Sequence, residues 1–355
     1  MTMELSELRK KIDNLDQKIV GLLNDRAKIT RAIGQLKIQQ KKGIYAPHRE
    51  KEVLKRIKAL NKGPMTNSAF EAIYREVMSS SLSLEKSLKI AYLGPAASFT
   101  HLAAIKKFGS QVEFVPCLNM SEVFIRVEND DCDYGVVPIE NSIEGAVTHT
   151  FDLLVDSELK ICSQTLLEIA HNLLSKSPLN KIKQVYSKAE VFGQCRNWIQ
   201  LNLPHADLIE APSTTRAAQV VKAKKNSACI ASELAAQVYD LPIIRKDIQD
   251  VAHNITRFLV LSKEDVPPTG KDRTSVMFSI KDKVGALHAM LTPFYRNGIN
   301  LTKIESRPSK KRAWDYYFFV DIEGHRQDVH VHKALSRLED MCKYLKILGS
   351  YPILE

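Results

Sequence analysis

The 355-residue sequence lacks the marks of several classes of protein. No apolar run approaches the roughly 20 residues that a membrane-spanning helix requires. The charged N-terminus has no apolar core of the kind found in signal peptides. The six cysteines are scattered without a Cys-x-x-Cys pair, which argues against both a zinc site and a disulfide framework. We therefore expect a reducing, cytoplasmic location and no bound metal.

The net charge of +10 belongs almost entirely to one end of the chain. Residues 1–90 hold 19 Lys and Arg against 10 Asp and Glu, whereas the remainder holds 32 against 31. A basic segment can bind nucleic acid, an acidic membrane or a small polyanion, and most often it is a solvated helix face. Only Tyr45, Phe70 and Tyr74 are available there to stack on bases, so a nucleic-acid-binding module is the less favoured alternative.

Three helices are predicted in the basic segment. Apolar residues recur at three- and four-residue steps through residues 4–40, and Lys42-Gly43 is expected to end this helix. Pro47 opens a second helix to about Leu60. A third runs from about residue 67 to residue 85. The first helix is too long for the other two to cover its apolar stripe, so a homodimer or higher homo-oligomer is expected.

The rest of the chain predicts two further domains, since a chain of this length exceeds one compact core. Short apolar strands alternate with helical segments from Lys89 onward, which is an α/β pattern. A polar, Pro-containing linker occupies residues 264–273, and a ferredoxin-like β-α-β-β-α-β order follows it. The predicted fold is multidomain. It comprises an all-α helical dimerising domain (1–88), a two-lobed α/β domain (89–263) and a ferredoxin-like α+β domain (274–355).

Polar motifs stand at the ends of two apolar strands of the α/β segment, where small ligands bind in such folds. One is Pro138-Ile139-Glu140-Asn141-Ser142, and the other is Asn254-Ile255-Thr256-Arg257-Phe258. Three further motifs accompany them in order: the loop from Gly94-Pro95, Tyr186-Ser187 with Gln194, and Ser213-Thr214-Thr215. Together these motifs resemble the prephenate dehydratase family over residues 89–263.

The resemblance implies decarboxylative dehydration of prephenate in a cleft between two lobes. Aromatisation drives this reaction, so no cofactor is expected. Thr256 is the expected catalytic residue, because its hydroxyl would polarise the departing hydroxyl group. Glu140 is expected to be structural. The residues expected to bind substrate are Asn141, Ser142, Ser187, Gln194, Ser213, Thr214 and Arg257. Ser213 also has the pattern of a plain helix N-cap, and both roles are compatible because a helix N-terminus attracts a carboxylate.

Residues 4–90 resemble the all-helical chorismate mutase family. Its substrate, chorismate, is a dianion on which cationic side chains should converge. Arg26 and Lys37 lie ~16 Å apart on nearly one stripe, whereas Arg9 lies ~25 Å from Arg26 and would reach the ligand only from a partner chain. The resemblance implies catalytic roles for Arg26, Lys37 and Glu85. It implies substrate binding by Arg9, Arg49, Glu50 and Ser81.

Two departures from this family leave an alternative open. Ala46 stands where members often carry an acid before the Arg-Glu pair, and Glu85 stands where some carry Gln. An ionised carboxylate has no proton to donate to the substrate's ether oxygen. A prephenate dehydratase with a weak or inactive mutase domain is therefore the alternative.

The C-terminal segment resembles ACT regulatory domains. The motifs are Gly285-Ala286-Leu287 and Glu305-Ser306-Arg307-Pro308, and all but the proline are expected to bind the effector phenylalanine. Together the three resemblances predict an enzyme that converts chorismate to prephenate and then to phenylpyruvate, carbon dioxide and water, under feedback inhibition by phenylalanine. A sensor without catalysis is the alternative from another class. The presence of Thr256 and Asn141 argues against it.

Overall fold

The computed structural model describes residues 4–40, 45–280, 284–309 and 316–353. The chain divides into two compact units, of which the first is Met1–Lys89 with Phe108–Glu113 and the second is Ile90–Lys107 with Phe114–Glu355. Throughout the described ranges, no helix combines the length and the apolar character that crossing a membrane requires.

Three helices make up most of the first unit, as the apolar spacing predicts. They are α1 (Leu5–Gln39), α2 (Pro47–Leu60) and α3 (Asn67–Glu85). The predicted end of the first helix at Lys42-Gly43 lies outside the described residues. Gly34 allows α1 to approach α3 closely, because a Cβ at this position would lie 2.7 Å from Cγ of Glu85.

The apolar stripe of α1 faces away from the other two helices. Only Thr30 and Gly34 of this helix are buried. The stripe residues are between 41% and 70% exposed: Leu5, Leu8, Ile12, Leu15, Ile19, Leu22, Ile29, Ile33 and Leu36. An exposed apolar surface of this length is typical of an interaction surface.

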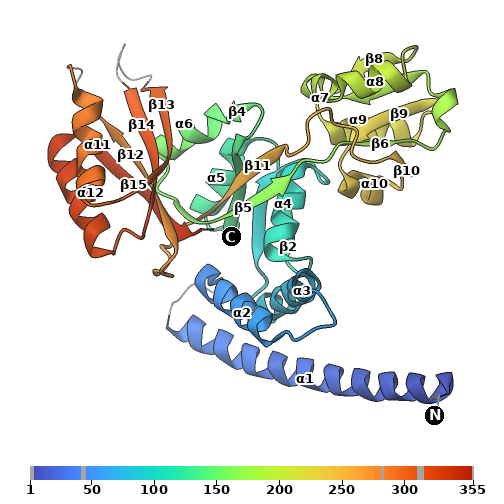
Figure 1. Cartoon of the computed structure of the whole chain (residues 1–355), viewed down its shortest axis with the longest axis horizontal. Helices are drawn as coiled ribbons and strands as arrows, with labels where there is room; N and C mark the ends of the chain where they lie inside the picture. Colours follow the sequence, from blue (N-terminus) through green and yellow to red (C-terminus); the bar gives the residue numbers. More distant parts are fainter. Residues whose placement is uncertain (1–3, 41–44, 281–283, 310–315, 354–355) are drawn as a thin grey trace. The chain divides into compact units, whose positions relative to one another are not determined.

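Two sheets form the α/β part of the second unit, which confirms the two-lobed α/β prediction (Figure 1). The first has the order β2-β1-β3-β11-β5, with β4 paired to β3. Its strands are β1 (Lys89–Leu93), β2 (Glu113–Cys117), β3 (Tyr134–Asn141), β4 (Gly145–Ala146), β5 (Lys160–Glu168) and β11 (Ile255–Ser262). Its helices are α4 (Phe99–Phe108), α5 (Met120–Glu128) and α6 (Thr148–Asp156).

The second sheet has the order β10-β6-β9-β7-β8. Its strands are β6 (Asn172–Leu174), β7 (Gln184–Ser187), β8 (Asp207–Glu210), β9 (Ser227–Ala231) and β10 (Ile243–Arg245). The helices of this lobe are the 3-10 helix η1 (Leu179–Lys181) and α7 (Ala189–Gln194), α8 (Arg196–Asn202), α9 (Thr214–Lys222) and α10 (Glu233–Tyr239).

The chain crosses between these two sheets twice, through residues 169–171 and residues 246–254. The crossing segments are hydrogen-bonded to each other. Ile169 N donates to the Asn254 carbonyl at 2.7 Å, and Ile248 N donates to the His171 carbonyl at 2.8 Å. Residues of both segments are therefore held in fixed positions at the junction of the two lobes.

The C-terminal residues form a four-stranded antiparallel sheet of order β13-β14-β12-β15, which confirms the ferredoxin-like prediction. Its strands are β12 (Asp272–Ser279), β13 (Leu301–Pro308), β14 (Tyr316–Glu323) and β15 (Tyr344–Pro352). The helices α11 (Ala286–Arg296) and α12 (Val329–Met341) cover one face of this sheet (Figure 1). The strand β13 is at one edge.

The other face of the C-terminal sheet shares a core with the first α/β sheet. Met277, Phe319 and Leu348 belong to the same buried cluster as side chains of β3, β5 and β11. Lys346 Nζ donates to the carbonyls of Leu154, Val155 and Ser157, where a cation is favoured because the C-terminus of α6 carries partial negative charge.

Candidate functional site

A chain of hydrogen-bonded side chains begins at Thr256, at the start of β11. Asn141 Nδ2 donates to Thr256 Oγ1 at 2.8 Å and to Asn254 Oδ1 at 2.6 Å. Asn254 Nδ2 donates to Gln194 Oε1 at 3.1 Å, and the same oxygen lies 2.7 Å from Nε2 of His171. We call these five residues the amide chain. It joins the end of β3 to α7 and to both crossing segments.

Contacts outside the amide chain fix the orientation of the Asn141 and Gln194 amides. The backbone N–H groups of Ile143 and Glu144 donate to Asn141 Oδ1 at 2.9 and 3.0 Å, so the amide nitrogen of Asn141 must face Thr256. Gln194 Nε2 donates to the Glu144 carboxylate at 3.0 Å, so the Gln194 carbonyl must face His171. Because Thr256 Oγ1 accepts from Asn141, the hydroxyl proton of Thr256 can be directed at another acceptor.

The remaining predicted dehydratase residues hold backbone groups near strand and helix ends. Ser142 Oγ accepts from Ile255 N at 2.9 Å, which ties the end of β3 to the start of β11. Ser187 is fully buried and donates to the Ile230 carbonyl at 2.8 Å. Ser213 accepts from Arg216 N at 3.0 Å, so the predicted N-cap of α9 is present. Thr214 is the first residue of α9, and the hydroxyl of the next residue, Thr215, is buried without a partner among the described residues.

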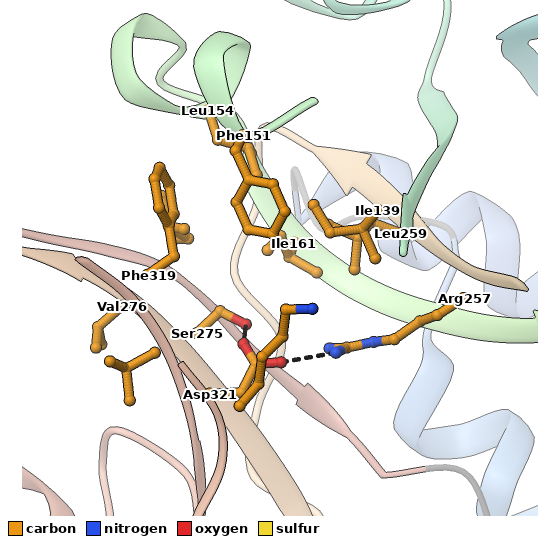
Figure 2. Close-up of a pocket in the computed structure, with 13 residues that line it drawn as sticks. Ile139, Phe151, Leu154, Ile161, Arg257, Leu259, Ser275, Val276, Phe319 and Asp321 are labelled. Atoms are coloured by element: carbon orange, nitrogen blue, oxygen red, sulfur yellow. Dashed lines mark hydrogen bonds and ion pairs between the residues drawn. The ribbon is translucent and has the colours of Figure 1, made fainter. Parts of the chain in front are cut away.

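Arg257 lies apart from the amide chain because successive residues of a strand face opposite sides. Its guanidinium donates to Asp321 at 2.7 Å, to Glu140 at 2.9 Å and to the hydroxyl of Tyr351 at 2.7 Å. Figure 2 shows the guanidinium directed at Asp321, which also accepts from Ser275. The structure therefore does not bring Arg257 together with the other residues predicted to bind prephenate.

A small cavity lies beside this ion pair (Figure 2). Its volume of about 20 Å³ has room for roughly one water molecule. Arg257, Ser275, Asp321 and Lys303 are its polar lining residues. Apolar side chains of the first α/β sheet, of α6 and of the C-terminal sheet line the rest. Prephenate is far too large for this space, so the cavity is not a substrate site.

The first unit brings together four of the predicted mutase residues. Arg26 on α1 donates to Ser81 Oγ on α3. Lys37 Nζ donates to Glu85 Oε2 at 2.9 Å, and the Glu85 side chain is only 7% exposed. A cluster with two cations in one small region is suited to a dianionic ligand.

The other three mutase candidates lie on α2 and near the N-terminus of α1. On α2, Glu50 accepts from the hydroxyl of Tyr45 at 3.0 Å, and Arg49 is exposed and paired with Glu52. Arg9 is exposed near the N-terminal end of the continuous helix α1. At 1.5 Å per residue it lies ~25 Å from Arg26, so it does not join the cluster within one chain.

The predicted effector residues lie at two places in the C-terminal domain. Gly285 precedes α11 in the left-handed conformation, with φ of 77°, which glycine adopts without strain. Next to it, Ala286 is buried and Leu287 is 36% exposed. Glu305, Ser306 and Arg307 lie on the edge strand β13. The structure thus distributes them over the start of a helix and an edge strand.

Two side chains of β13 contact the first α/β sheet. Lys303 Nζ pairs with Glu140, which directly precedes Asn141. Arg307 pairs with Asp152 on α6 at 3.3 Å. These contacts flank the segment 141–148, which carries Asn141 and Ser142. The edge strand β13 is therefore linked to residues on both sides of the segment that carries Asn141 and Ser142.

The described ranges contain no group of three or more His, Cys, Asp or Glu side chains that could hold a metal ion.

Models of three families match consecutive parts of the chain. Chorismate mutase type II matches residues 8–86, Prephenate dehydratase matches residues 90–266, and the ACT domain matches residues 274–340. A bifunctional chorismate mutase/prephenate dehydratase from Aquifex aeolicus (strain VF5) is 48% identical over 98% of both chains. This chain belongs to the bifunctional chorismate mutase/prephenate dehydratase family. The resemblances that the sequence motifs indicate are thus confirmed.

Other members of this bifunctional family and a solved structure support the same assignment. The Pseudomonas aeruginosa relative of the same description is 42% identical over 98% of both chains. A prephenate dehydratase from Arthrobacter aurescens, solved in complex with L-Phe, aligns with a TM-score of 0.70 and 32% identity. That alignment covers 75% of this chain and 90% of the other.

Three residues of the site were not among the predicted site residues. Asn254 opens the motif that contains Thr256, so its place in the motif was a usable signal. Glu144 and His171 carry no comparable signal. Their roles depend on contacts with Gln194, which is 50 residues from Glu144 and 23 residues from His171 in the sequence.

Proposed function

We propose that this chain rearranges chorismate to prephenate in its helical domain and dehydrates prephenate to phenylpyruvate in its α/β domain. The boundaries that we assign are 1–88, 89–263 and 274–355, the last being the ACT domain. The observation that carries the dehydratase assignment is the amide chain, which orients a donor onto Thr256. Purified protein supplied with chorismate should form prephenate and then phenylpyruvate, and the two should be followed separately.

In the dehydratase reaction, the ring carboxylate leaves as carbon dioxide and the electron pair of its C–C bond enters the ring. The C–O bond of the ring hydroxyl breaks with its pair on oxygen. Thr256 donates a hydrogen bond to that oxygen as charge develops on it, and the departing hydroxide takes a proton from solvent to become water. The N-terminus of α9, with Ser213 and Thr214, suits a substrate carboxylate because its free N–H groups attract anions. Asn141 and Gln194 supply further polar side chains of this site.

In the mutase reaction, negative charge develops on the ether oxygen as the C–O bond breaks. Lys37 is the donor assigned to this oxygen, and Arg26 binds a carboxylate. We assign Arg9 of a second copy to the same site, with a homodimer formed through the exposed stripe of α1. The cysteines in the described residues are all free, which is consistent with the cytoplasmic location that we propose.

Replacement of Glu85 by glutamine tests the mutase assignment and its alternative. Glu85 accepts from Lys37, and it can donate to the ether oxygen only when protonated. A glutamine amide donates without being protonated, so Glu85→Gln should raise mutase kcat. Initial mutase rates of the two proteins give the result, with Glu71→Gln as control, because Glu71 pairs with Lys58, which is not a predicted site residue. An unchanged kcat would remove Glu85 from the mechanism. A wild type without mutase activity but with full dehydratase activity would support the alternative of an inactive mutase domain.

We further propose that phenylalanine binds the ACT domain and inhibits the dehydratase. The left-handed Gly285 leaves the first N–H groups of α11 open to an effector carboxylate. Ser306 lies on the edge strand β13. Two other residues of this strand form ion pairs with the α/β part: Lys303 with Glu140, and Arg307 with Asp152 of α6. Inhibition requires that phenylalanine bind one conformation more tightly than another. Through these two ion pairs, a change of conformation in the ACT domain would reach segment 141–148.

Two glycines with matched backbones test the effector site. Gly285 and Gly298 both have positive φ, of 77° and 65°, and an added Cβ at either would meet no atom within 4 Å. Alanine should impose the same backbone strain at both positions, of the order of 1 kcal/mol. We expect Gly285→Ala to abolish the calorimetric heat of phenylalanine binding and Gly298→Ala to preserve it. Equal binding by the two variants, or no heat with the wild type, would contradict this site.

A further inference from the structure

His171 is held rigidly at the junction of the two α/β lobes. It is 2% exposed and lies in the first crossing segment. Its backbone N–H donates to Gln249 Oε1 at 2.9 Å, and its carbonyl accepts from Ile248 N at 2.8 Å. The ring of Phe99 meets the imidazole edge-on at 5.6 Å between centroids. The position of the imidazole is thus set by the second crossing segment and by α4.

The protonation of this imidazole follows from its neighbours. The Glu144 carboxylate can only accept, so it turns the amide nitrogen of Gln194 towards itself and the carbonyl towards His171. His171 must therefore carry its proton on Nε2 and donate it to Gln194. Burial lowers the pKa of His171, opposed by the hydrogen bond to Gln194, and this keeps the ring neutral.

The other ring nitrogen contributes no hydrogen bond. Nδ1 of His171 is buried and has no hydrogen-bond partner among the described residues. An unpaired buried acceptor destabilises a folded protein, and leucine would not introduce one. The contribution that histidine makes and leucine cannot make is the hydrogen bond from Nε2 to Gln194.

We infer that His171 is a positioning residue for the dehydration step, and this inference rests on the proposed role of Thr256. By donating to Gln194, it fixes the amide to which Asn254 donates. Asn254 in turn accepts from Asn141, whose second N–H is directed at Thr256. Each amide that loses its partner gains rotational freedom. Four hydrogen bonds join His171 to Thr256, and loss of the first of them therefore loosens the orientation of the Thr256 hydroxyl.

This role predicts an effect on kcat rather than on KM. The hydrogen bond from Thr256 strengthens as charge develops on the leaving oxygen, so its alignment matters in the transition state. Substrate carboxylates held at α9 do not depend on this alignment. A purely structural histidine would instead change stability, KM and the activity of the other catalytic domain without a preference for one of them.

The test compares His171→Leu with His171→Gln in the full-length chain. We expect His171→Leu to lower dehydratase kcat about tenfold, with KM changed by less than about twofold. His171→Gln keeps an N–H at a similar reach and should restore most of the rate. Denaturant unfolding midpoints of the same preparations report on folding and should be unchanged, and so should mutase activity, whose residues lie in the other unit. In a Gln194→Ala background, His171→Leu should have little further effect, because the link that it breaks is already absent.

Two results would overturn the inference. One is a wild-type kcat in His171→Leu. The other is an equal loss in the leucine and glutamine variants, with KM or mutase activity changed as well. Thr256→Ala separates this failure from failure of the proposed function. If Thr256→Ala is inactive while His171→Leu is normal, only the inference about His171 fails. If Thr256→Ala is fully active, the assignment of Thr256 fails first.

Discussion

Replacing Thr256 by alanine is expected to lower dehydratase kcat about 100- to 1,000-fold, the range seen when one donor to a developing oxyanion is removed. In this variant the hydroxyl that accepts from Asn141 is gone, so no hydroxyl remains to donate to the departing oxygen. Mutase activity should stay within about twofold, because its residues lie in the first unit of the chain. Initial rates with chorismate and with prephenate measure the two effects separately.

Two further variants sharpen this test. Thr256→Ser keeps the hydroxyl and should retain most dehydratase activity, whereas Thr256→Val keeps the shape and should resemble alanine. Arg26→Ala should give the reverse pattern, with the mutase lost and the dehydratase near normal. Full dehydratase activity in Thr256→Val would show that the hydroxyl has no part in the reaction.

The second large effect concerns stability. Replacing Arg257 by leucine should destabilise the second unit by about 3–5 kcal/mol, as expected when one partner of a buried ion pair is removed. The side chains of Arg257 and Asp321 are only 7% and 10% exposed, so leucine would leave Asp321 charged and buried without its cation. Denaturant unfolding of the full-length chain, followed by a signal from the C-terminal sheet, measures the loss.

Matched substitutions distinguish this cause from loss of packing. The double variant Arg257→Leu/Asp321→Leu removes both charges and should recover part of the stability. Lys263→Leu breaks an exposed pair with Asp130 and should have little effect, because water screens such pairs. If Arg257→Leu were as stable as Lys263→Leu, the buried ion pair would not be what holds these strands together.

The same network makes stability depend on acid. Burial alone raises the pKa of Glu140, but hydrogen bonds from Lys303 and Arg257 lower it below its ordinary value of 4.5. A carboxyl whose pKa is lower in the folded protein stabilises the fold above its unfolded pKa. That stabilisation is lost as pH falls through the folded pKa. Unfolding midpoints of the wild type should therefore fall in acid, and those of Glu140→Gln should fall less.

The helices and the outline of the catalytic motifs were predictable because they depend on neighbours in the sequence. Apolar spacing gave α1, and Pro47 marked the start of α2. The strand β8 has no such pattern in the sequence, because most of its residues are exposed and show no apolar alternation. The strand β4 has only two residues, which is too short to show a strand pattern in the sequence.

The role of Arg257 was not predictable from the motif that contains it. Thr256 and Arg257 are adjacent, yet β11 turns them to opposite faces. The guanidinium of Arg257 pairs with Asp321, which lies 64 residues further along the chain. The role of His171 was not predictable either. It depends on the hydrogen bond to Gln194, whose amide is oriented by Glu144, and not on residues near His171 in the sequence. Sequence motifs group residues by order, whereas the fold groups them by face.

Because the apolar stripe of α1 is exposed, we expect dilution to lower the mutase activity before the dehydratase activity. If Arg9 reaches the mutase site only from a partner chain, monomers have no complete mutase site, whereas each α/β domain carries its own amide chain. By mass action, the fraction of dimer falls as total protein falls. Chorismate turnover per chain should then decline while prephenate turnover per chain is maintained. The ratio of the two specific activities would serve as a gauge of assembly that needs no physical separation of monomer from dimer.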